Sequence, residues 1–131
     1  MKKITIMIVF VLVTGYLAAQ TLTIQIENAD VGKGYLMIGV FNDEKTFPDT
    51  YFRGKRTAVS ERIMTVTFTD LPKGQYAVSV YQDINNNEQL DKNLFGIPKE
   101  KYGFSNNSDR PNYRKCLFDF YDNTTITIRL K

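Results

Sequence analysis

The sequence predicts an all-β protein, an antiparallel β-sandwich of six or seven strands with one long ordered loop. Apolar and polar residues alternate with a period of two in several segments, which is typical of half-buried strands. No long stretch carries apolar groups at helical spacing, so we expect any helices to be short. Because strands with one apolar face must bury that face, and no helix is expected to cover it, the partner layer is a second sheet.

The expected strands follow one another along residues 20–131. In chain order they are residues 21–27, 36–40, 57–60, 64–68, 76–80, 116–120 and 125–130, of which 57–60 has the weakest pattern. Between two of them, Pro72 presets φ for a turn and Gly74 is expected to supply a positive φ. We therefore expect residues 68–76 to form a hairpin that joins adjacent antiparallel strands.

The N-terminal residues predict an export signal. Lys2 and Lys3 precede an apolar run from Ile4 to Val13, and small residues lead to an expected cleavage site after Ala19. This run is well short of the roughly 20 residues that a membrane-spanning helix requires. We expect residues 1–19 to be a cleavable signal peptide and residues 20–131 to be a single β-sandwich domain. The product is then exported, periplasmic or extracellular, with no membrane span after cleavage.

Charge and missing residue types exclude several classes of function. The formal net charge is +3, but removing Lys2 and Lys3 leaves 15 Lys and Arg against 14 Asp and Glu, a net charge of +1. A protein that binds a phosphate backbone needs clustered cations on one face, so we expect no nucleic-acid partner. With no histidine and one cysteine, the chain has no histidine-dependent triad, no histidine-ligated zinc site and no internal disulfide. We expect Cys116 to pack as a small hydrophobe.

The long segment from Asp83 to Arg114 shows no sustained alternation. Loops of this length are uncommon in compact domains and are usually functional or internally packed. Apolar anchors such as Leu90 and Phe104, together with turn residues such as Gly96, predict that the segment is ordered. Since the chain offers no disulfide and no histidine, its own small core or a cation bound by oxygen atoms must hold it in place.

The start of this segment predicts a weak calcium site. Oxygen ligands stand at positions 1, 3, 5, 7 and 9 of an EF-hand-like spacing, the seventh through its backbone carbonyl: Asp83, Asn85, Asn87, Gln89 and Asp91. Glu88 occupies position 6, where Gly is usual, and Leu94 occupies position 12, where a bidentate Glu is usual. We therefore expect an affinity in the class of roughly 10⁻⁴ to 10⁻³ M. The alternative is an Asn-rich turn held by Asx hydrogen bonds, with no metal.

Three blocks of the sequence resemble an exported bacterial family. They are residues 67–78, which contain Leu71-Pro72-Lys73-Gly74-Gln75-Tyr76, residues 83–91, and residues 96–107. Over nearly all of residues 20–131 the chain is similar to the family catalogued as domain of unknown function 2141. More loosely, the Leu-Pro-x-Gly-x-Tyr turn is similar to that of transthyretin-like (prealbumin-like) and collagen-adhesin B-type β-sandwiches. The resemblance implies a sandwich topology and export, and it implies no reaction. The family pattern has Gly where this chain has Glu88.

Two functional hypotheses remain. The first is a secreted, non-catalytic binding or structural module, with carbohydrate or an envelope protein as partner. Aromatic faces beside amide and carboxylate groups suit sugar recognition. The expected ligand surface comprises Glu100, Tyr102, Phe104, Asn106 and Asn107, with Asp109 and Tyr113 nearby. Alternatively, Tyr102 and Phe104 form a private core of the loop.

The second hypothesis is a carboxylate-dependent glycoside hydrolase or a carbohydrate-binding accessory domain. A hydrolase needs two carboxyl groups about 5 to 9.5 Å apart in a cleft. Asp83, Glu88, Asp91 and Glu100 are the candidates for such a pair. We favour the non-catalytic module, because ion ligation or solvation accounts for all four carboxylates.

Overall fold

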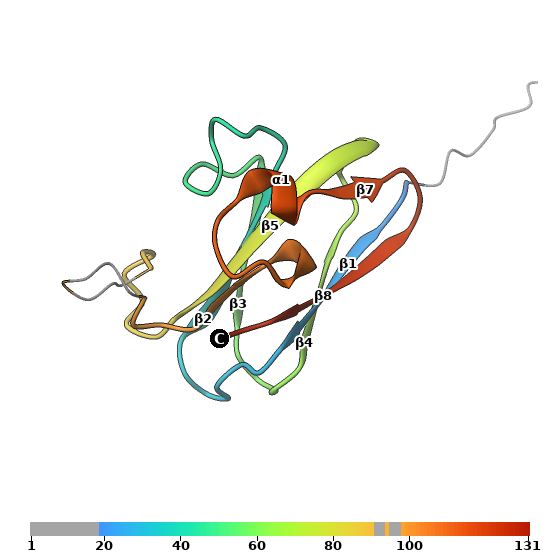
Figure 1. The fold of residues 1–131 in the computed structure, drawn as a ribbon. Coiled ribbons are helices and arrows are strands. Elements are labelled where there is room, and N and C mark those ends of the chain that lie inside the picture. Colours follow the sequence, from blue (N-terminus) through green and yellow to red (C-terminus); the bar gives the residue numbers. More distant parts are fainter. Residues whose placement is uncertain (1–18, 91–93, 95–97) are drawn as a thin grey trace, which may run out of the picture.

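The computed structural model describes residues 19–90, 94 and 98–131. In these ranges eight strands form two sheets that pack face to face, with almost no helix (Figure 1). The predicted all-β sandwich is therefore confirmed, with eight strands where six or seven were expected. The predicted signal peptide lies outside the described residues except for Ala19, and it stays a prediction. Within the described ranges, no helix is long and apolar enough to cross a membrane.

The smaller sheet has three strands in the order β4-β1-β8. They are β4 (Met64–Phe68), β1 (Leu22–Glu27) and β8 (Thr124–Arg129). The predicted alternation in β1 is confirmed, because Leu22, Ile24 and Ile26 are buried and the residues between them are half-buried. β1 is antiparallel to β4 but parallel to β8, which the sequence did not predict. A parallel pair needs a long crossover, and here the whole second sheet connects the two strands.

The larger sheet has β3 (Arg53–Ala58), β2 (Tyr35–Phe41), β5 (Gly74–Asp83) and β6 (Tyr102–Phe104) in that order, each antiparallel to its neighbour. A fifth strand, β7 (Phe118–Phe120), pairs with the first residues of β5. β5 is therefore the central strand. It ends at Asp83, the first residue of the predicted cation loop.

The prediction of a hairpin between residues 68 and 76 is wrong. β4 pairs with β1 in one sheet and β5 pairs with β2 in the other, so this turn carries the chain between sheets. Gly74 has no positive φ, and the Tyr76 hydroxyl donates to the Pro72 carbonyl at 2.5 Å. The turn chemistry predicts the reversal of the chain. It does not say which sheet receives the next strand, since that depends on how both apolar faces reach the same core.

Three further differences concern where strands and helices form. The weak strand expected at 57–60 forms earlier, at Arg53–Ala58. Cys116 does not begin a strand but ends the single-turn helix α1 (Tyr113–Cys116), whose first turn is capped by the Asn112 side chain accepting from the Lys115 N–H. β6 lies within the segment predicted to be without strands. A short 3-10 turn, Ser105–Asn107, follows it.

Two apolar clusters lie on the two faces of the larger sheet. The main core fills the space between the sheets and draws alternate residues from both: Leu22, Ile24, Ile26, Leu36, Ile38, Val40, Val66, Phe68, Tyr76, Val78, Val80, Phe120 and Ile128. A second cluster contains Phe41, Phe47, Ala77, Phe104 and Cys116, so by strand alternation it covers the outer face of the larger sheet. Cys116 is buried and free, and burial raises the pKa of its thiol. Its predicted role as a packed hydrophobe is confirmed.

Two fully buried polar side chains connect the strands to the loops. Gln82 accepts from the first backbone N–H of the turn 30–33 at 2.9 Å, and its amide donates to two carbonyls of that turn at 2.8 and 2.7 Å. Ser105 accepts from the Val78 N–H at 2.9 Å and donates to the Cys116 carbonyl at 2.5 Å. Buried polar groups need such partners, so these two side chains hold the turn and the helix in place.

Candidate functional site

The predicted cation loop begins on a buried carboxylate. Asp83 is fully buried at the end of β5. Its Oδ1 accepts from the Asn87 N–H at 3.2 Å, and its Oδ2 accepts from the Glu88 N–H at 2.7 Å. Burying an unpaired carboxylate is costly, and hydrogen bonds from backbone N–H groups offset that cost. Asp83 thus winds the next residues around its own side chain.

Two amides continue the same winding. Asn85 Oδ1 accepts from the Asn87 N–H at 3.4 Å, and Asn87 Oδ1 accepts from the Gln89 N–H at 3.0 Å. Asn86 and Glu88 have positive φ values, 57° and 59°. Left-handed backbone costs a non-glycine residue roughly 1–2 kcal/mol, so the surrounding hydrogen bonds must hold Glu88 in the conformation for which position 6 usually has glycine.

Four of the five predicted ligands therefore belong to one tight turn, and Asp91 lies outside the described residues. Within the described part of the chain, no three His, Cys, Asp or Glu side chains gather as a metal site. The predicted site depends instead on amide and backbone oxygens together with Asp83. The same hydrogen bonds are those of an Asx-stabilised turn, so both interpretations share this geometry.

Neighbouring elements hold the turn from three sides. Glu100, which is 7% exposed, accepts from the Ile84 N–H through Oε2 at 2.6 Å, and so connects the two ends of the loop. The Arg56 guanidinium on β3 lies 3.6 Å above the centre of the Tyr35 ring and donates to the Asn86 side-chain oxygen. Gly34 approaches the Asp83 carbonyl so closely that a Cβ atom would lie 1.9 Å from its oxygen.

The turn also surrounds Tyr81 with negative charge. Burial first, and then the charges of Asp83, Glu100 and Glu88, raise the pKa of Tyr81 from 10.0 to about 12. The Tyr81 hydroxyl therefore stays protonated further into the alkaline range than that of an ordinary tyrosine. The same three carboxylates give this end of the sheet a field that favours a cation.

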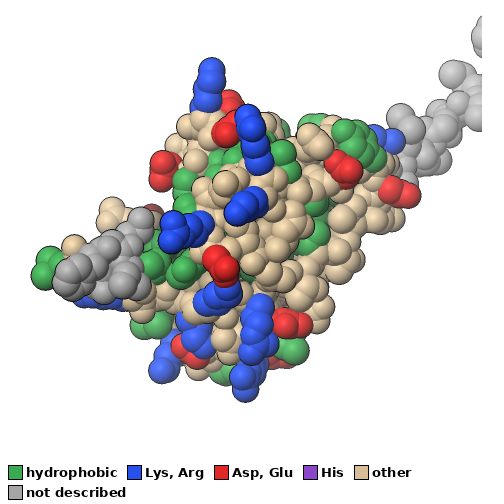
Figure 2. Space-filling model, viewed as in Figure 1, with side chains coloured by type: hydrophobic (Ala, Val, Ile, Leu, Met, Phe, Trp, Pro, Cys, Tyr) green, Lys and Arg blue, Asp and Glu red, His purple; other side chains and the backbone are tan. Residues whose placement is uncertain are grey.

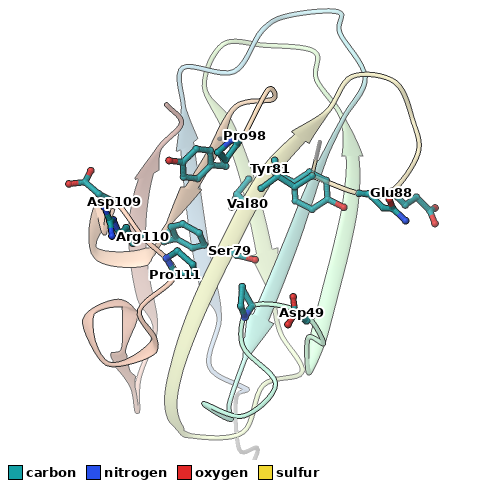
Figure 3. A pocket seen from close by; sticks show the side chains of 14 residues that line it. Asp49, Ser79, Val80, Tyr81, Glu88, Pro98, Asp109, Arg110 and Pro111 are labelled. Carbon is teal, nitrogen blue, oxygen red and sulfur yellow. The ribbon is translucent and has the colours of Figure 1, made fainter. Parts of the chain in front are cut away.

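A cleft of about 690 Å³ lies beside the turn (Figure 3). Its floor is the outer side of β5 and β6, including Ser79, Tyr81 and the aromatic rings of Tyr102 and Phe104. Figure 3 shows Tyr81 and Glu88 on one side, Asp109, Arg110 and Pro111 on the other, and Asp49 towards one end. Pro48 and Asp49 come from the segment between β2 and β3, and Glu88, Gln89 and Leu90 come from the cation loop. The loop is therefore one wall of the cleft.

The structure divides the predicted ligand surface into two groups. Tyr102 and Phe104 line the cleft. Their ring centres lie 5.8 Å apart, Phe104 belongs to the second apolar cluster and Tyr102 packs against it. The two residues therefore serve both as core and as part of the cleft surface. Asn106 donates to the carbonyls of residues 115 and 117, and Asn107 accepts from the N–H of residue 129. These two amides and Glu100 hold backbone segments together rather than lining the cleft.

Asp109 and Tyr113, which were expected near the ligand surface, lie in different surroundings. Asp109 lines the cleft and forms an ion pair with Lys131. Tyr113 packs on Phe47, with 5.6 Å between ring centres. Of the four carboxylates considered for hydrolysis, Glu88 lines the cleft, whereas Asp83 and Glu100 accept backbone N–H groups outside its lining. Asp91 is outside the described residues.

Sequence reasoning missed several residues of the cleft. Ser79 and Tyr81 point to the outer face of β5, because Val78 and Val80 point to the main core. Extending the predicted strand 76–80 by one residue would have placed Tyr81 on that outer face. Asp49 and Arg110 come from segments without periodicity, so only the tertiary structure brings them to the cleft. On the face shown in Figure 2, Lys and Arg side chains are interspersed with Asp and Glu and form no patch of one sign.

Comparison with known proteins adds one family. A family model described as an uncharacterized protein conserved in bacteria, domain of unknown function 2141, matches residues 24–128. No curated protein and no solved structure is significantly similar to the chain. The looser likeness to transthyretin-like sandwiches therefore stays a prediction.

Proposed function

Because the chain belongs to the bacterial family of domain of unknown function 2141, whose description assigns no activity, we propose from the chain's own loop that it is an exported, non-catalytic binding module with a weak calcium site. Residues 83–91 form the site, with Asp83, Asn85, Asn87 and Asp91 offering side-chain oxygens and Gln89 its carbonyl. The partner is carbohydrate or an envelope protein, and it occupies the cleft beside the loop.

One observation carries the calcium proposal. The Asp83 carboxylate lies fully buried inside a turn whose next two odd-numbered residues are turned back on the backbone by Asx hydrogen bonds. Calcium takes six to eight oxygen ligands, and a turn with an oxygen at every second residue can supply them around one ion. The carboxylates of Asp83, Glu100 and Glu88, which add to the effect of burial in raising the pKa of Tyr81, support a cation at the same end of the sheet.

The departures from the ideal loop support weak rather than tight binding. Glu88 adopts a positive φ of 59° without being glycine, so position 6 has the conformation that the loop needs. Leu94, at position 12, is fully exposed and brings no oxygen from its side chain. Few charged ligands and no bidentate Glu place the affinity at roughly 10⁻⁴ to 10⁻³ M.

Calcium would act on the cleft through the loop. Glu88 and Gln89 belong both to the turn and to the cleft wall. An ion that holds the turn also holds this wall, and less ordering is then needed when a ligand binds. We therefore expect calcium to raise ligand affinity without contacting the ligand.

Thermal unfolding with and without calcium tests the proposal. With a dissociation constant of about 1 mM, calcium at about 10 mM stabilises the folded state by about 1.4 kcal/mol. For a domain of this size that corresponds to a rise in Tm of roughly 5 °C. Asp83→Asn keeps one side-chain oxygen that can accept a backbone N–H, but it removes the charge. This variant should therefore abolish the rise in Tm. Asn85→Ala, at an exposed position, should at least halve it.

The matched control is Asp70→Asn. Asp70 is an exposed carboxylate that pairs with Arg53 at 3.0 Å on a different turn. This variant should keep the full calcium response. If wild-type Tm does not change at about 10 mM calcium, or if Asp83→Asn and Asp70→Asn respond alike, the loop is an Asx-stabilised turn without an ion.

A further inference from the structure

A second hollow extends the cleft across the larger sheet. It has a volume of about 390 Å³ and shares Pro48, Asp49, Ser79, Tyr81 and Glu88 with the cleft. Its other lining residues lie on or above β2 and β3, whereas the cleft lies over β5 and β6. The two hollows therefore make one trough on the outer face of the sheet, crossing four strands. Three strand spacings of about 4.8 Å give it a length of roughly 14 Å, more than one sugar ring.

Two glycines in the floor of the trough make room for an aromatic ring. Gly39 on β2 and Gly54 on β3 are partners in the strand register. A Cβ atom on Gly54 would lie 2.6 Å from the Tyr51 ring, and one on Gly39 would lie 3.2 Å from Tyr51 Cβ. Glycine weakens a strand, and its presence inside one often marks a close approach from outside. Here the approaching group is Tyr51, which is nevertheless 58% exposed.

Aromatic rings occur along the whole trough. Tyr51 lies over β2 and β3, Tyr81 stands on β5, and Tyr102 stands on β6 as the register partner of Tyr81. Each ring combines an apolar face with a hydroxyl group. Three such rings along one sheet face suit a ligand that is itself a row of flat apolar faces with polar edges.

The charges in the trough favour a neutral ligand. Asp49 and Glu88 are balanced by Arg56 and Arg110, and Asp109 forms an ion pair with Lys131. No hydrogen bond or ion pair joins the side chains of Asp49, Ser79 and Arg110 to another described residue. They leave acceptors and donors open along the trough, which an apolar ligand could not satisfy. An added peptide strand would instead require the edge of a sheet, and the trough lies on a sheet face.

From these features we infer that the trough binds a linear, neutral polysaccharide chain, laid across β3 to β6 with one sugar ring stacked on Tyr51. Tyr81 and Tyr102 contact the next rings, and Asp49, Ser79 and Arg110 bond to sugar hydroxyls. This inference names the ligand of the proposed binding module. It does not require the calcium ion, because Tyr51, Ser79 and Tyr102 are held outside the cation loop.

Binding to a glycan array tests the inference. The array should contain linear neutral hexaoses of α- and β-linked glucose, mannose and xylose, with polygalacturonate and polylysine as charged comparators. We expect binding to at least one neutral series, measured again by calorimetry. Tyr51→Ala should weaken it about tenfold, the loss of one stacking contact, and Tyr51→Phe should keep most of it.

Tyr121→Ala provides the matched control. Tyr121 is as exposed as Tyr51, 57% against 58%, but it follows β7 and lines neither hollow. Its replacement should leave binding unchanged. Failure to bind any neutral glycan, preference for a charged comparator, or equal losses in the two alanine variants would overturn the inference. Repeating the measurement with EDTA separates the two proposals, since glycan binding that persists without a calcium response retains the trough and removes the ion.

Discussion

Replacing Gly34 with Ala should destabilise the protein much more than replacing Gly32 with Ala. Both glycines lie in the turn before β2 and have positive φ, 74° at Gly32 and 59° at Gly34. Their surroundings differ. A Cβ atom on Gly32 would meet nothing within 4 Å, whereas one on Gly34 would lie 1.9 Å from the Asp83 carbonyl oxygen. The two positions therefore share a backbone cost and differ in the steric clash with the backbone of Asp83 and Ile84.

The expected magnitudes follow from these two terms. Left-handed backbone costs alanine roughly 1–2 kcal/mol at either position. At Gly34 the obstacle is backbone in the register pair of Tyr35 and Asp83, so β2 and β5 must shift apart there. Overpacking of this kind adds about 1–3 kcal/mol. The effect of alanine on the unfolded chain is the same in both variants and cancels in the comparison.

Urea and thermal unfolding followed by circular dichroism measure the difference, since the chain has no tryptophan to report by fluorescence. At roughly 4 °C per kcal/mol, Tm of Gly34→Ala should lie about 4–12 °C below that of Gly32→Ala. The contact involves Asp83, so the rise of Tm with calcium should also shrink in Gly34→Ala and persist in Gly32→Ala. Equal stability of the two variants would refute the steric reasoning.

Three other substitutions have defined outcomes. Gln82→Met should cost about 1–3 kcal/mol in urea unfolding, because it leaves backbone groups of the turn 30–33 unpaired; an unchanged midpoint would contradict this. Ser105→Ala should cost a similar amount by removing both hydrogen bonds of a fully buried hydroxyl, and a loss below about 0.5 kcal/mol would show that these bonds contribute little. Tyr81 keeps its proton to about pH 12 in the folded state and loses it near pH 10 when unfolded. Its stabilising contribution is therefore present below pH 10 and is lost as the pH rises from 10 to 12. Tyr81→Phe should flatten this alkaline decline in the free energy of unfolding, and an unchanged pH curve would disprove the pKa shift.

Strand positions were predictable wherever one face of a strand is buried. In β1 the alternation of Leu22, Ile24 and Ile26 with polar residues corresponds to the observed burial, because a side-chain period of two is a local property of extended chain. The partners of the strands were not predictable in the same way. β4 and β5 carry similar patterns and are joined by a turn, yet they belong to different sheets.

The cation loop and the trough differ in the same respect. The winding around Asp83 involves residues within five positions of it in the chain, so the spacing of oxygen-bearing side chains was enough to predict which residues gather. A calcium loop and an Asx-stabilised turn without metal share this winding. The trough instead unites Tyr51, Tyr81 and Arg110, which are far apart in the sequence and have no common pattern.

Local chemistry along the chain thus accounts for the class of fold, the phase of the main strands and the turn that starts at Asp83, because each depends on near neighbours in sequence. The order of strands, the parallel pairing of β1 with β8 and the Tyr51 side chain against Gly39 and Gly54 depend on contacts between distant segments. Those contacts form when apolar faces are buried together, and many pairings can satisfy a given sequence pattern. The tertiary structure selects one pairing, and that choice turns a conventional β-sheet face into a candidate binding surface.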